Sequence, residues 1–194
     1  MVSATRDVEL VGDATASNLA RAALFAALIG AFAYVSFPNP VSPAPVTLQV
    51  LGVFLAGILL GPVWGGAACG LYLLAGALGA PVFAGGSAGL GVLVGPTAGY
   101  LWSYPFAAAA IGVVVHGGTS LVDPTSISLL RLVGAMALGV VVIYAFGVVG
   151  LMAVQNLGPV EAFLGGAAAF IPAEVLKIVA GVGIVRSDAI AAAR

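Results

Sequence analysis

Apolar residues fill long stretches of this sequence, and short groups of proline, glycine and polar residues separate these stretches. A helix that crosses a bilayer takes about 20 predominantly apolar residues. The pattern predicts membrane-spanning helices at 19–37, 47–61, 63–79, 96–115, 128–154 and 160–185. Because six is an even number of crossings, both termini are expected on the same side of the membrane.

Turn-forming residues fix several boundaries of these helices. Ser17 and Asn18 are suitable N-caps for the first helix, because their side chains can accept hydrogen bonds from its first N–H groups. Gly61 and Pro62 lie between the second and third predicted helices, and neither residue favours a continuous helix. The stretches before and after them are therefore predicted as separate spans.

The last apolar stretch has two possible arrangements. One helix could run over 160–185 with Pro172 in its interior, or a short helix at 160–170 could precede a final helix that begins near Pro172. Proline fits the first turn of a helix, but in the interior it removes a backbone hydrogen bond and clashes with the preceding turn. We therefore prefer the second arrangement.

Two connections between the predicted helices have an unusual composition. The segment 38–46 contains four prolines, which keep it extended or turned, and the segment 82–95 is too rich in glycine for a regular helix. Irregular backbone at membrane depth is tolerated only where it is buried in protein or lines a cavity. The glycines would suit a close-fitting ligand site, but tight helix packing explains them equally well.

Composition and charge support a membrane protein with a defined orientation. The 194 residues are 62% apolar and 7% charged, whereas soluble domains carry about 25% charged residues. The connections predicted on one side, 38–46, 80–95 and 155–160, contain no Lys or Arg. The segments predicted on the other side contain Arg6, Arg21, Arg131, Arg186 and Arg194.

Basic residues concentrate on the cytoplasmic side of membrane proteins. We therefore expect a multi-pass protein of the cell membrane with both termini in the cytoplasm. In this all-α organisation, a polar cytoplasmic segment at 1–18 precedes a single six-helix membrane domain at 19–190. The net charge of −1 gives no basic face for nucleic acid.

Glu174 and Lys177 are ionisable residues in the apolar body of the last predicted span. A charge at the centre of a bilayer costs about 2.5–3.5 kcal/mol on insertion scales. The spacing of three places both side chains on one helix face, where each partly neutralises the other. They are either a structural pair or part of a cavity that binds a polar ligand, and we favour the cavity.

No arrangement of catalytic groups emerges from the sequence. The GxSxG pattern occurs once, as GGSAG at 85–89, but no strand precedes it and glycine abundance makes a chance match common. Metal-ligand spacing of Cys and His is absent, and so is a nucleotide-binding Walker motif. We therefore expect no enzyme, no cofactor and no metal site, and ATP-driven transport would need energy from another chain.

Several motifs in a specific order resemble those of the BioY family, the biotin-specific S components of energy-coupling-factor (ECF) transporters. The motifs are PVTLQ at 45–49, GLYLLAG at 70–76, GAPVFAGG at 79–86, GPTAGYL at 95–101 and PAEVLK at 172–177. This resemblance implies a six-helix S-component bundle that holds biotin near the outer surface under the first loop. It also implies two kinds of partner, a transmembrane T component and two ATP-binding cassette ATPase subunits.

S components dock on the T component through small residues of the first helix. The resemblance therefore points to Ala22 with Ala26, or Ala23 with Ala27, as the docking residues. The implied substrate-binding residues are Thr47, Gln49, Tyr72, Phe83, Gly85, Gly86, Thr97, Tyr100, Glu174 and Lys177.

In this interpretation Glu174 and Gln49 bind the ureido ring of biotin, and aromatic side chains pack on its thiophane ring and valeryl chain. Lys177 would balance either Glu174 or the carboxylate of the ligand. The chain departs from the family pattern at Glu174, where the family usually has Asp, and it has no Arg or Lys in 80–105 to meet that carboxylate. The alternatives are an S component for another small vitamin, a carrier that works without ATPases, or a polytopic enzyme that acts on lipid.

Overall fold

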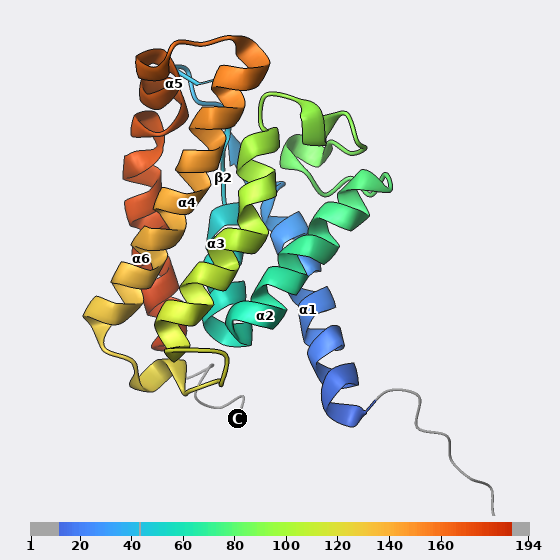
Figure 1. Ribbon diagram of the computed structural model, residues 1–194, viewed down its shortest axis with the longest axis vertical. Helices are drawn as coiled ribbons and strands as arrows, with labels where there is room; N and C mark the ends of the chain where they lie inside the picture. Colours follow the sequence, from blue (N-terminus) through green and yellow to red (C-terminus); the bar gives the residue numbers. More distant parts are fainter. Residues whose placement is uncertain (1–11, 43, 188–194) are drawn as a thin grey trace, which may run out of the picture.

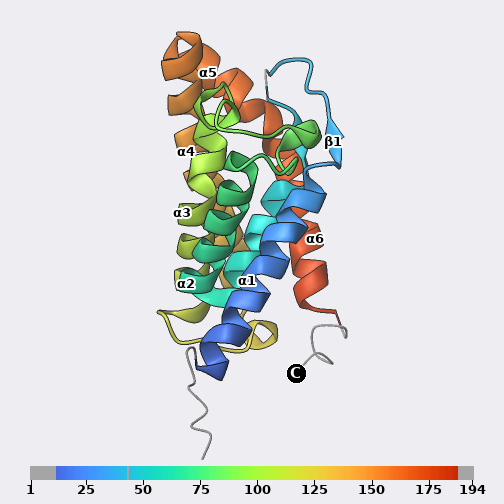
Figure 2. The same cartoon turned by 90° about the vertical axis from the view of Figure 1, so that its right-hand side faces the viewer.

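Helices run along the long axis of the molecule, and irregular loops join them at both ends (Figures 1 and 2). The computed structural model describes residues 12–42 and 44–187. Five helical segments in this part of the chain are long and apolar enough to cross a membrane. The helices are α1 (Asp13–Phe32), α2 (Gln49–Ala77), α3 (Ala98–His116), α4 (Leu129–Gln155), α5 (Pro159–Gly166) and α6 (Ile171–Val185), of which α5 and α6 form one spanning segment.

The first helix begins and ends earlier than the sequence pattern predicts. Gly12 is the N-cap of α1, and Asp13 in the first turn suits the positive end of the helix dipole. Ser17 and Asn18 therefore lie inside the helix, and their predicted role as caps is wrong. The helix stops at Phe32 rather than at residue 37, because the chain turns there into a short strand.

The second helix contains a sharp reversal that the sequence marks with Gly61 and Pro62. Gly61 has φ +76° and ψ −175°, a backbone conformation that only glycine adopts readily. A side chain at Gly65 would lie 2.8 Å from the carbonyl oxygen of Ala56, so the arm after Gly61 packs back along the arm before it. The predicted break is present, but α2 counts as one apolar segment, so the six predicted spans become five.

The final segment adopts the arrangement that we prefer from the sequence. Helix α5 ends at Gly166, a 3-10 turn follows over Ala168–Phe170 (η4), and α6 starts at Ile171 with Pro172 in its first turn. Proline therefore stands where its missing N–H costs no intrahelical hydrogen bond.

The proline-rich and glycine-rich connections are irregular, as predicted, and they share one end of the bundle. The first pairs two short antiparallel strands, β1 (Ser36–Phe37) and β2 (Val46–Thr47), a small exception to the predicted all-α fold. The second contains the 3-10 turns η1 (Ala84–Gly86) and η2 (Val92–Val94). We call this end, with α5 and η4, the pocket end (Figure 1).

The opposite end of the bundle carries the start of α1, the loop at 117–128 and the end of α6 (Figures 1 and 2). We call it the basic end, because Arg131 in the first turn of α4 and Arg186 at the C-cap of α6 lie there, and Arg21 lies in the first half of α1. Between the two ends, the interior is packed with apolar side chains such as Phe54 and Met136. The outer faces are also apolar, with Leu24 and Leu176 each 70% exposed. Apolar residues on both faces suit helices surrounded by lipid.

Candidate ligand-binding site

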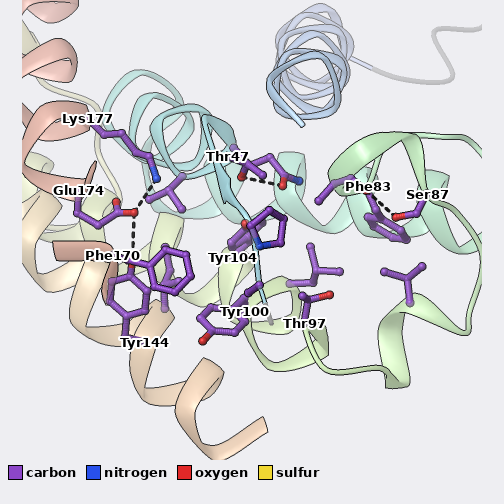
Figure 3. A pocket seen from close by; sticks show the side chains of 18 residues that line it. Thr47, Phe83, Ser87, Thr97, Tyr100, Tyr104, Tyr144, Phe170, Glu174 and Lys177 are labelled. Atoms are coloured by element: carbon purple, nitrogen blue, oxygen red, sulfur yellow. Dashed lines mark hydrogen bonds and ion pairs between the residues drawn. The ribbon is translucent and has the colours of Figure 1, made fainter. Parts of the chain in front are cut away.

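A cavity of about 250 Å³ lies between the helices near the pocket end and is closed in part by the irregular connections (Figure 3). Small-molecule sites usually have volumes of about 300–1,000 Å³, so this cavity, just below that range, suits a ligand at the small end of the class. Seven of the ten residues predicted to bind substrate line it, namely Thr47, Gln49, Phe83, Thr97, Tyr100, Glu174 and Lys177. The other three, Tyr72, Gly85 and Gly86, are not among its lining residues.

Glu174 and Lys177 form a buried ion pair on one wall of the cavity. The Lys177 ammonium donates a hydrogen bond to Oε1 of Glu174 at 2.6 Å, and both side chains are almost fully buried. Because α6 begins next to Pro172, both residues lie in its first two turns, near the pocket end. The pair is thus positioned by the proline that starts the helix.

Tyr144 of α4 completes this cluster from the facing helix. Its hydroxyl donates to the same Oε1 atom of Glu174 at 2.8 Å, so that one oxygen accepts two hydrogen bonds (Figure 3). The other oxygen, Oε2, is buried and has no hydrogen-bond partner among the described residues. A buried carboxylate oxygen without a donor is costly, and a ligand N–H group would supply that donor.

A second polar group lies at the start of α2. The Thr47 hydroxyl donates to Oε1 of Gln49 at 3.0 Å, and the Gln49 amide donates to the hydroxyl of Tyr72 at 2.5 Å. Tyr72 therefore holds Gln49 in place from behind the wall and does not form the wall itself. Its ring also packs edge-on against Phe83, with centroids 5.5 Å apart.

Aromatic rings from three elements form an apolar wall beside the ion pair. Tyr144 lies 6.2 Å from Tyr100 and 5.8 Å from Phe170 between ring centroids. The hydroxyl of Tyr100 donates to the carbonyl oxygen of Gly166 at 2.7 Å, which ties α3 to the end of α5. Tyr104 also lines the cavity.

Sequence reasoning missed Tyr104, Tyr144 and Phe170 as lining residues. Only Tyr144 has a local signal, because it is the only residue between Arg131 and Gln155 whose side chain carries nitrogen or oxygen. A hydroxyl inside an otherwise apolar span needs a partner, and here that partner is the Glu174 carboxylate.

Gly85 and Gly86 shape the loop and leave its neighbours to line the cavity. Both have positive φ, +66° and +76°, in the turn that pairs Phe83 with Ser87. Phe83 and Ser87 both line the cavity. The Ser87 hydroxyl donates to the carbonyl oxygen of Ala84 at 2.9 Å. His116, the only histidine of the sequence, lies at the far end of α3, so the serine of the GGSAG pattern has no histidine beside it.

The structure separates the two pairs of alanines considered for docking. Ala22 is fully buried in a small cluster with Ala56, Leu60 and Ala68, so it presents no surface to a partner in this structure. Ala26 is half-buried, whereas Ala23 and Ala27 are exposed on the outer face of α1.

Apolar spanning helices around a buried polar cavity define a membrane protein with a small-molecule site. The sequence model of the BioY family matches residues 4–193. The chain is 40% identical over 171 residues to the biotin transporter BioY of Rhizobium etli, covering 84% of this chain and 87% of the relative. It is 38% identical over 170 residues to the biotin transporter BioY of Rhodobacter capsulatus, with the same two coverages. The chain therefore belongs to the BioY family.

A solved structure agrees with this assignment. The fold is similar to the crystal structure of the S-component for biotin from an ECF-type ABC transporter, with a TM-score of 0.80 and 26% sequence identity. The similarity covers 91% of this chain and 93% of that one. The expected resemblance is therefore confirmed.

Proposed function

We propose that this chain captures biotin for uptake, as the substrate-binding S component of an ECF-type importer. The observation that carries this proposal is the Glu174 carboxylate, buried in a cavity of small-ligand size with one oxygen that lacks a donor in the described structure. Membership of the BioY family and the biotin transporters among its relatives support the same ligand. The chain is then a binding subunit and not an enzyme.

The ureido ring of biotin offers two N–H donors and one carbonyl acceptor, which complement the ion pair. Glu174 accepts a ureido N–H on its unsatisfied oxygen, and Lys177 shares its remaining N–H groups with the ureido carbonyl. Hydrogen bonds to charged groups contribute about 1.5–3 kcal/mol each. Gln49, which donates one amide N–H to Tyr72, is the third polar contact in this arrangement. The rings of Tyr100 and Phe170 pack against the thiophane ring.

We also propose that the two arms of α2 enter and leave the bilayer separately, which makes six passages. The reversal at Gly61 supports this count, and so does the position of the start of α1 and the end of α6 at the same end of the bundle (Figure 2). Arginines concentrate at that end, which places it in the cytoplasm by the positive-inside rule. The pocket end then faces outward, as capture from outside the cell requires.

The proposed partners are a T component and two ATP-binding cassette ATPases. The S-component structure from an ECF-type ABC transporter supports an assembly of this kind. Ala23 and Ala27 are the proposed contact with the T component, because both side chains are small, apolar and exposed on α1. Small residues at such spacing allow helices to approach closely in membranes.

The test of the proposed function is equilibrium binding of labelled biotin to the detergent-purified protein, with riboflavin and thiamine as competitors. We expect saturable binding that unlabelled biotin displaces and that neither other vitamin reduces. Circular dichroism and gel filtration establish that the protein is folded and monodisperse. Folded protein that binds no biotin, or that releases it to riboflavin or thiamine, would overturn the assignment.

A further inference from the structure

The cavity has one charged end and one uncharged end. Glu174, Lys177 and Tyr144 lie at one end, and Phe83, Ser87 and Thr97 lie at the other (Figure 3). The side chains between them, such as Tyr100 and Tyr104, carry no charge. A biotin molecule that places its ureido ring at the ion pair therefore extends its valeryl tail, which ends in the carboxylate, toward the hydroxyl groups of Ser87 and Thr97.

Among the residues that the structure describes, Lys177 is the only cation that lines the cavity. The sequence has no Lys or Arg between Arg21 and Arg131, and Lys177 is the only one between Arg131 and Arg186. The described arginines of α4 and α6 are held at the basic end, where Arg131 donates to the carbonyl oxygen of Val114 and Arg186 to that of Ile127. Since Lys177 already pairs with Glu174, the described lining of the cavity is neutral overall.

The uncharged end also opens outward. Ser87 is exposed although it lines the cavity, and Thr97 is half-buried. The Thr97 hydroxyl makes no capping bond to the first turn of α3. A tail that reaches these residues is thus close to water and meets neutral groups only.

We infer, given the proposed function, that this chain recognises the bicyclic ring of biotin and not the charge of its carboxylate, so that it also binds uncharged biotin carboxamides and esters. The polar groups at the tail end could favour an anion only weakly. A nearby helix N-terminus such as that of α3 changes affinity by about two- to fivefold. Loss of a hydrogen-bonded ion pair would instead weaken binding by about tenfold or more.

The reverse orientation, with the ligand carboxylate at Lys177, has an electrostatic disadvantage. It would place a second carboxylate beside that of Glu174, and the two anions would share one ammonium group in a buried site. Like charges at such a distance repel strongly where water is excluded. The ureido N–H groups would then lie at the other end of the cavity, and Oε2 of Glu174 would remain without a donor.

The inference is tested by displacing labelled biotin from the purified protein with unlabelled biotin, biotin carboxamide and biotin methyl ester. We expect the affinities of both neutral compounds to lie within about fivefold of that of biotin. A loss of tenfold or more for both compounds would overturn the inference. Absence of labelled-biotin binding would overturn the proposed function instead, so the two failures are distinguishable.

A gain-of-charge variant tests the position of the tail independently. Ser87→Arg adds a cation at an exposed lining position, where a salt bridge contributes modestly. We expect this variant to prefer biotin over the carboxamide by about two- to fivefold more than the unmodified protein does. Thr119→Arg, on an exposed loop of the basic end, is the matched control and should leave the ratio unchanged. An unchanged ratio in Ser87→Arg would overturn this placement.

Discussion

The two ends of the bundle use their ionisable side chains in different ways. At the basic end the arginines bond to the main chain: Arg131 donates to the carbonyl oxygen of Val114 at 2.6 Å, and Arg186 donates to those of Thr125 and Ile127. At the pocket end, Glu174 bonds only to side chains among the described residues, and one of its oxygens is left without a donor.

This difference separates charges that complete the fold from charges that are available to a ligand. The last carbonyl groups of a helix have no partner within that helix, and Arg131 satisfies one of them at the end of α3. Arg186 bonds instead to carbonyl groups of the loop that precedes α4. Nothing in the backbone geometry requires Glu174 or Lys177 at the first turns of α6. Their burial is costly unless hydrogen bonds compensate for it, and a ligand would supply the missing one.

The largest effect on biotin affinity is expected from Glu174→Gln, which removes the charge and keeps the size of the side chain. Losing a hydrogen bond to a charged acceptor should weaken binding by about 10- to 150-fold. Isothermal titration calorimetry of the purified variants with biotin measures this change in affinity. Glu161→Gln, on the exposed face of α5, is the matched control and should change affinity less than about twofold. An equally small change in Glu174→Gln would show that the ion pair is structural. The charges of the two ends would then no longer differ in their role.

A smaller effect is expected from Tyr144→Phe, because Glu174 keeps its bond to Lys177 when the phenol oxygen is removed. The variant frees the carboxylate to rotate, and one hydrogen bond of ordinary strength corresponds to about two- to twelvefold in affinity. Tyr100→Phe lines the same cavity but loses a bond to the carbonyl oxygen of Gly166, so it is the control for a general loss of packing.

The double variant Tyr144→Phe/Glu174→Gln decides whether Tyr144 acts by positioning the carboxylate. If it does, the effect of Tyr144→Phe on affinity falls below about twofold in the Glu174→Gln background, because the two groups belong to one network. Additive effects of the two substitutions would instead mean that Tyr144 contacts the ligand on its own or supports the wall of the cavity.

The sequence was sufficient to predict the features that depend on local chemistry. Long apolar stretches predicted the helices, Gly61 and Pro62 predicted the break in α2, and Pro172 predicted the start of α6. Two charges in an apolar stretch predicted the ion pair, because such charges need each other or a ligand. The predicted boundaries of α1 were wrong at both ends, because the helix includes the polar residues from Asp13 onward and the apolar run continues past Phe32 into the strand that follows.

The aromatic wall was not predictable in the same way. Tyr72 was expected in the cavity and lies behind it, whereas Tyr104 was not expected and lines it. Which side of a helix faces inward follows from the polar and apolar pattern around its circumference. Helices α2 and α3 are apolar on nearly all sides, so only the packing of the whole bundle fixes their rotation. The sequence alone cannot supply that rotation.

The smallest effect on biotin affinity is expected at the basic end, from His116→Phe. The histidine is buried; its Nδ1 accepts from the N–H of Val122, and its Nε2, which must then carry the proton, donates to the carbonyl oxygen of Ile58. Phenylalanine fills the space but leaves both backbone groups without a partner. The free energy of unfolding should therefore fall by about 1–3 kcal/mol for each group left unsatisfied.

Thermal unfolding in detergent measures the loss of stability in His116→Phe, and biotin titration well below the unfolding midpoint measures affinity in the folded protein. We expect a clearly lower midpoint with a biotin affinity within about twofold of the unmodified value. Thr119→Val, on the exposed loop beside this histidine, should change neither quantity. If His116→Phe weakened biotin binding as much as Tyr144→Phe, the two ends would be energetically coupled. The basic end would then contribute to capture and not only to the fold, because a local loss of hydrogen bonds reaches a distant site only through a shared conformational equilibrium.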